Sequence, residues 1–167
     1  EIDPTEDGVD GTILFAAPFM GDIVSIARPL GLYRVHSQNQ SGVGRSLEQT
    51  TIERTMRRHI SRMTKLRAIL LRLDVREELV DPVKTFYFRE LEFMMSVTRG
   101  QRIELARLIR LLKSLWLDYL PFIRKAGLSA LYLAAALSSS AKAKRLLEYR
   151  MTPSGRSPGG FLKLMLT

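Results

Sequence analysis

Residues 46–150 contain only two glycines and two prolines, and this scarcity of helix-breaking residues constrains the fold more than any other feature. Apolar side chains recur in this region at helical spacing, beginning with Ile52, Met56, Ile60 and Met63. We therefore expect a helical region over residues 46–150, and a mainly α protein.

The first expected helix runs from Ser46 to about Leu73, with Ser46 and Gln49 forming a capping box. The next begins at Asp81-Pro82 and ends at Gly100, because proline suits a first helical position and glycine suits a C-terminal cap.

The remaining helices are expected at residues 103–116 and 128–149, with a fresh helix start at Pro121 between them. Residues 152–160 are rich in Pro, Gly and Ser, so residues 151–167 are predicted to form a flexible tail.

Residues 1–45 differ in composition from the helical region, because they contain more Gly and Pro and only short apolar runs. The run from Thr12 to Phe19 predicts a short helix that Asp10 could cap and Gly21 would end. Residues 23–26 and 30–35 are typical of two short strands, followed by a polar loop. These elements are too few for a domain, and they are typical of the edge of a larger α/β sheet.

The chain carries a formal net charge of +9 and contains no cysteine. The missing cysteines exclude disulfides, thiolate metal sites and cysteine nucleophiles from these residues. The positive charge indicates either an anionic partner or an ordinary solvated helical surface. Nucleic acid is the less favoured partner, because the basic run from Arg54 to Arg67 contains no aromatic residue. His59 stands alone in that run, and we expect it to be solvated.

The stretch from Leu128 to Leu137 is the most apolar, but it is too short to cross a bilayer. An interfacial helix is one interpretation, because Lys142, Lys144, Arg145 and Arg150 follow it and could meet anionic head groups. The alternative is a buried bundle helix with a basic last turn that suits the helix dipole.

Residues 3–45 combine Asp10, Gly21 before a β-type run, the pair Pro29-Leu30, the stretch from Tyr33 to His36, and a loop with Asn39 and Ser41. This order resembles the C-terminal part of the catalytic domain of family-2 glycosyltransferases, which have the GT-A fold. The resemblance implies a C-terminal remnant of an α/β GT-A domain over residues 1–45, followed by the helical region and the tail.

The resemblance also implies roles for individual residues. Asp10 corresponds to the carboxylate that acts as catalytic base toward the acceptor hydroxyl, although an aspartate there also suits a helix N-cap. Arg34 and His36 are expected near the donor diphosphate, with His36 a candidate contact for a divalent Mn or Mg ion. Alternatively, Arg34 and His36 merely share one face of a strand.

The resemblance further implies a nucleotide-sugar donor and a saccharide or lipid-linked acceptor, as in the synthesis of cell-envelope polysaccharide. No Asp-x-Asp metal motif occurs in the sequence. We therefore expect the C-terminal part of a longer enzyme, inactive by itself, in the cytoplasm or at the inner face of the membrane. A basic helical module that binds an anionic surface is the competing hypothesis.

Overall fold

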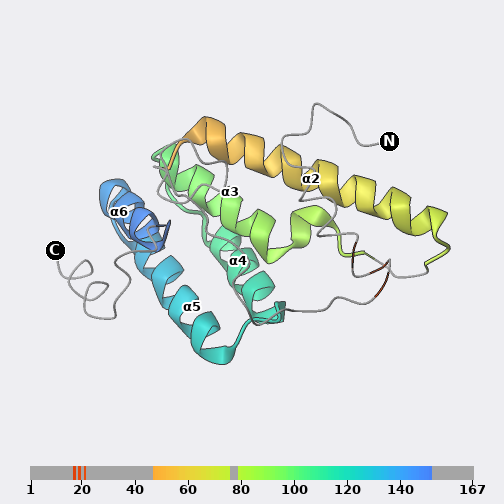
Figure 1. Cartoon of the computed structure of the whole chain (residues 1–167). Coiled ribbons are helices and arrows are strands. Elements are labelled where there is room, and N and C mark those ends of the chain that lie inside the picture. Colours follow the sequence, from red (N-terminus) through yellow and green to blue (C-terminus); the bar gives the residue numbers. More distant parts are fainter. Residues whose placement is uncertain (1–16, 18, 20, 22–46, 76–78, 152–167) are drawn as a thin grey trace, which may run out of the picture.

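The computed structural model describes residues 17, 19, 21, 47–75 and 79–151. These residues form α-helices and one 3-10 helix, drawn in Figure 1: α2 (Gln49–Arg72), η1 (Pro82–Lys84), α3 (Phe86–Thr98), α4 (Leu105–Leu117), α5 (Phe122–Leu137) and α6 (Ser140–Met151).

The predicted fold class, with an α/β remnant ahead of the helices, is wrong for the part of the chain that the structure describes. That part contains helices and no strand. The expected strands at residues 23–26 and 30–35, and Asp10 before them, lie outside the described residues. The physical reason is that the helices of the described part bury their apolar faces against one another and so form a core without a sheet.

Helix α3 is the centre of the bundle, in contact with α2 on one side and with α4 and α6 on the other (Figure 1). Its sequence explains the position, because apolar residues surround most of its circumference and such a helix must be covered on several sides. Helices α5 and α6 pack against each other, and α5 also contacts α4.

The main core draws on α3, α4, α5 and α6 together. Phe93 of α3 meets the ring of Tyr132 of α5 edge to face, with 5.3 Å between the ring centroids. Six large side chains have no solvent exposure: Phe93, Leu111, Leu115, Tyr132, Leu146 and Leu147. The first half of α2 joins this core, while Leu66 and Leu70 form a smaller cluster with Phe19 and neighbouring residues.

Two helices end in the same hydrogen-bonding motif. After α3, Gly100 has φ of +66°, its N–H donates to Val97 O, and the Gln101 N–H donates to Ser96 O. After α2, Asp74 takes the corresponding left-handed conformation with φ of +52°. The predicted end of the helix at Gly100 is therefore confirmed. Asp74 takes the corresponding left-handed position at the end of α2.

Other helix ends differ from the prediction. Glu48, and not Ser46, is the N-cap of α2, and its side chain makes no capping hydrogen bond. The helix expected over residues 128–149 is two helices, because Ser138 is extended and its hydroxyl turns back to Ala134 O.

Candidate functional site

The residues that the glycosyltransferase resemblance singles out, Asp10, Arg34 and His36, lie outside the described residues. The base, the diphosphate contact and the Mn or Mg ion therefore stay predictions. Among the described residues, no three His, Asp or Glu side chains gather so as to hold a metal ion.

The four predicted anion contacts all belong to α6, but their surroundings differ. Lys144 and Arg145 are exposed, and Lys142 is half-buried. Arg150 turns inward, and its Nη2 lies 2.6 Å from Oε1 of Glu90 on α3. Two of the four cations are thus open to solvent, and Arg150 links α6 to α3.

Glu90 is the centre of a buried polar network. Its Oε1 accepts a hydrogen bond from the Tyr132 hydroxyl as well as the ion pair from Arg150. The side chains of Glu90 and Arg150 are 9% and 27% exposed, so the ion pair is largely withdrawn from water. Burial, and then the Glu90 charge, raise the pKa of Tyr132 well above its usual range, so the phenol stays a proton donor. The sequence analysis does not predict this network, because Tyr132 and Arg150 lie 42 and 60 positions after Glu90 in the chain.

His59 is buried and not solvated, contrary to the sequence interpretation. Its Nε2 lies 3.1 Å from Oγ1 of Thr85, whose hydroxyl donates to Pro82 O and accepts from the Phe88 N–H. Because the Thr85 proton is already committed to Pro82, Nε2 of His59 is assigned as the donor. Burial lowers the pKa of His59, which favours this neutral form. The histidine thus fixes the residue that caps α3.

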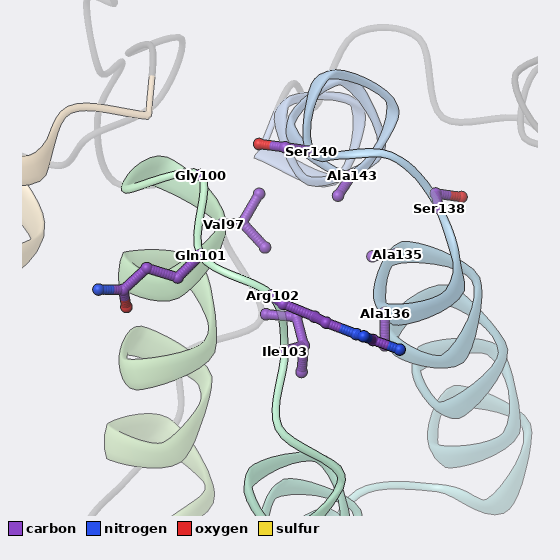
Figure 2. Close-up of a pocket in the computed structure, with 10 residues that line it drawn as sticks. All are labelled: Val97, Gly100, Gln101, Arg102, Ile103, Ala135, Ala136, Ser138, Ser140 and Ala143. Atoms are coloured by element: carbon purple, nitrogen blue, oxygen red, sulfur yellow. The ribbon is translucent and has the colours of Figure 1, made fainter.

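A pocket of about 230 Å³ lies between the α3–α4 connection and the α5–α6 connection. Figure 2 shows the Arg102 side chain running across it toward Ala136, while the Gln101 amide points away. Val97, Ile103 and Ala143 give it an apolar lining, and hydroxyls of Ser138 and Ser140 stand at its edge. The lining of the pocket is thus partly apolar and partly polar, and it includes none of the predicted site residues.

The most unusual surface belongs to α4, α5 and their connection. Nine large apolar side chains there are exposed, and they make up most of those found on the described surface. They are Leu105, Ile109, Trp116, Leu117, Tyr119, Phe122, Ile123, Leu133 and Leu137. Single exposed apolar residues are normal, but a gathering of this kind marks an interaction surface.

Aromatic contacts order the corner between the two helices. Trp116 and Phe122 meet edge to face with ring centroids 5.7 Å apart. The Trp116 indole N–H donates to Ser129 Oγ at 3.2 Å, and Lys125 Nζ donates to Trp116 O at 2.9 Å. Tyr119, between the helices, is fully exposed.

None of the helices in the described part is both long and apolar enough to cross a membrane. No protein-family model matches the chain, and searches of curated proteins and of solved structures find no significant match.

Proposed function

We propose that this chain is the C-terminal part of a nucleotide-sugar-dependent glycosyltransferase of the family-2 type. The observation that carries the proposal is the ordered set of Asp10, Pro29-Leu30 and Tyr33-Arg34-Val35-His36. In this proposal Asp10 takes the proton from the acceptor hydroxyl, and Arg34 and His36 lie near the departing diphosphate and its metal ion. The acceptor is a saccharide or a lipid-linked saccharide.

The helical region is compatible with such an appended position. In the part of the chain that the structure describes, the main core consists of Leu47 and of residues from α2 to α6 and their connections. An appended domain of this kind can position an enzyme without taking part in sugar transfer.

The test uses the protein expressed from the complete open reading frame of the gene. Asp10→Asn should lower the turnover of transfer by about 10²–10⁴-fold, the usual contribution of a positioned base, while the affinity for the donor stays close to wild type. Asp7→Asn is the matched control, since Asp7 lies in the same acidic segment and has no assigned role. Wild-type turnover in Asp10→Asn would remove Asp10 from the base role. An upstream gene sequence that lacks an Asp-x-Asp motif and an α/β pattern would refute the enzyme itself.

We also propose a second function, peripheral binding to an anionic membrane surface by the helical region. It is supported by the net charge of +9 and by the exposed Lys144 and Arg145 on α6. A membrane position would serve an enzyme whose acceptor is lipid-linked, yet the two functions can be tested separately.

A further inference from the structure

Helix α5 is apolar on two opposite faces. Leu131, Tyr132, Ala134 and Ala135 face the core. The opposite face, at spacings of three and four residues, consists of Phe122, Ala126, Ala130, Leu133 and Leu137, all of them exposed. A helix at the surface of a water-soluble bundle normally turns polar residues outward, so this face indicates that something covers it.

The neighbouring helix extends the same surface. Leu105, Ile109, Leu112 and Trp116 follow one another along α4 at spacings of four, three and four residues, so they form one stripe. The stripe ends at Trp116, which contacts Phe122 and Ser129 of α5. The two stripes therefore meet at the corner and form one surface, which we call the outer α4–α5 face.

We propose that the outer α4–α5 face lies on an anionic lipid bilayer, with Trp116, Tyr119 and Phe122 inserted at the level of the head groups. The inference rests on the second proposed function and names the surface that performs it. Trp and Tyr favour the membrane interface because their rings are apolar and their N–H and O–H groups reach water.

The charges around the face match this partner. Residues 102–137 carry six basic side chains and two acidic ones. Four of the basic side chains are exposed (Arg102, Arg110, Lys113 and Arg124), and Lys113 adjoins the α4 stripe, because it lies four positions after Ile109 and three before Trp116. Cations beside an apolar face attract anionic head groups while the apolar residues enter the acyl boundary, which is the arrangement of an interfacial helix.

A second copy of the chain fits the face less well. In a two-fold dimer the same surface appears on both partners, so the basic side chains of one copy would be brought toward those of the other. That repulsion is absent at an anionic bilayer, where each cation instead gains an opposite charge.

Trp116 is the only tryptophan of the chain, so its fluorescence reports directly on the proposed face. The 167-residue chain is mixed with vesicles of phosphatidylcholine, with and without phosphatidylglycerol. We expect a blue shift of Trp116 emission and quenching by bromine-labelled acyl chains on the anionic vesicles only. Added salt should weaken the binding.

The variant Phe122→Ser/Ile123→Ser removes two apolar side chains that are 70% and 84% exposed. It should lower partitioning into anionic vesicles by at least about tenfold. The matched control is Leu71→Ser/Val80→Ser, which removes side chains that are 75% and 61% exposed but belong to α2 and the segment before η1. The control should bind as the wild type does, and circular dichroism should show both variants folded.

A third variant, Lys144→Glu/Arg145→Glu, separates this inference from the proposed α6 contact. Retained binding here, with loss in the Phe122/Ile123 variant, supports the outer α4–α5 face and removes the α6 contact. The reverse result, loss here with undiminished binding by the Phe122/Ile123 variant, overturns the inference and leaves membrane binding to α6. Equal binding to neutral vesicles overturns the anionic partner, and so does self-association that shields Trp116 without lipid.

Discussion

The ion pair between Glu90 and Arg150 should show a marked asymmetry when either partner is removed. Arg150→Met leaves a carboxylate that is 9% exposed with Tyr132 as its hydrogen-bond donor in this network. Glu90→Gln leaves a guanidinium that is 27% exposed and can turn toward water, while the amide oxygen can still accept from Tyr132.

The magnitudes follow from this difference in burial. Opposite charges about 4 Å apart attract by about 4 kcal/mol at the effective dielectric constant of about 20 that suits such sites. Losing one partner of a buried pair costs about 3–5 kcal/mol, because the other charge stays buried. We expect about 3 kcal/mol for Arg150→Met. For Glu90→Gln we expect about 2 kcal/mol, since Arg150 recovers part of its hydration and a neutral hydrogen bond remains.

Urea unfolding, followed by circular dichroism and by Trp116 fluorescence, measures the free energy of unfolding of each variant. The double variant Glu90→Gln/Arg150→Met should cost less than the two single losses added together, with a coupling of about 1.5 kcal/mol or more. Additive losses below about 0.5 kcal/mol each would refute the reasoning, because they would mean that the pair is no stronger than an exposed surface ion pair.

Two further changes are predicted for the bundle. The pKa of His59 is lowered in the folded chain, so the unfolded chain takes up the proton first as the pH falls below about 6.5, and stability should decrease there. Urea unfolding at a series of pH values measures this decrease in the free energy of unfolding. His59→Gln should make the decrease smaller, whereas the control His36→Gln should not change it. The same decrease in His59→Gln as in the wild type would contradict the role given to His59. Asp74→Gly should stabilise the chain by about 1 kcal/mol and Gly100→Ala should destabilise it by about the same amount, because both positions are left-handed. Thermal unfolding measures the stability of both variants. Stability changes of the same sign in the two variants would contradict a common motif at the two helix ends.

The sequence predicts most of the helical region because its helices are set by local signals. Gly100 ends α3 as expected, and Pro121 stands directly before α5. The exceptions are also local: Ser138 divides the last predicted helix, since its hydroxyl competes for a backbone carbonyl. Single-residue boundaries of this kind depend on hydrogen bonds that periodicity does not reveal.

Tertiary contacts are where the sequence interpretation fails. His59 lies in a basic run, which favours a solvated side chain. In the fold it is buried against Thr85, Tyr87 and Phe88, which lie 26 or more positions later in the chain. The sequence predicts that Arg150 is a cation in the last turn of a helix. The packing of α6 on α3 is what brings it to Glu90. The apolar outer face of α5 is predictable from the sequence. Its residues Ala126, Ala130, Leu133 and Leu137 follow one another at helical spacing, opposite the core residues.

The buried network and the exposed face are connected through the geometry of the bundle. Arg150 and Tyr132 fasten both α6 and α5 to Glu90 on α3, so the inner face of α5 is fixed by a hydrogen bond with a definite direction. If α5 rotated about its axis to bury Leu133 and Leu137, Tyr132 would leave Glu90 and the largely buried carboxylate would lose a donor. The bundle therefore cannot cover the outer α4–α5 face by a rearrangement of α5 alone. The buried network therefore holds that face outward at a defined orientation, which suits the proposed contact with a bilayer.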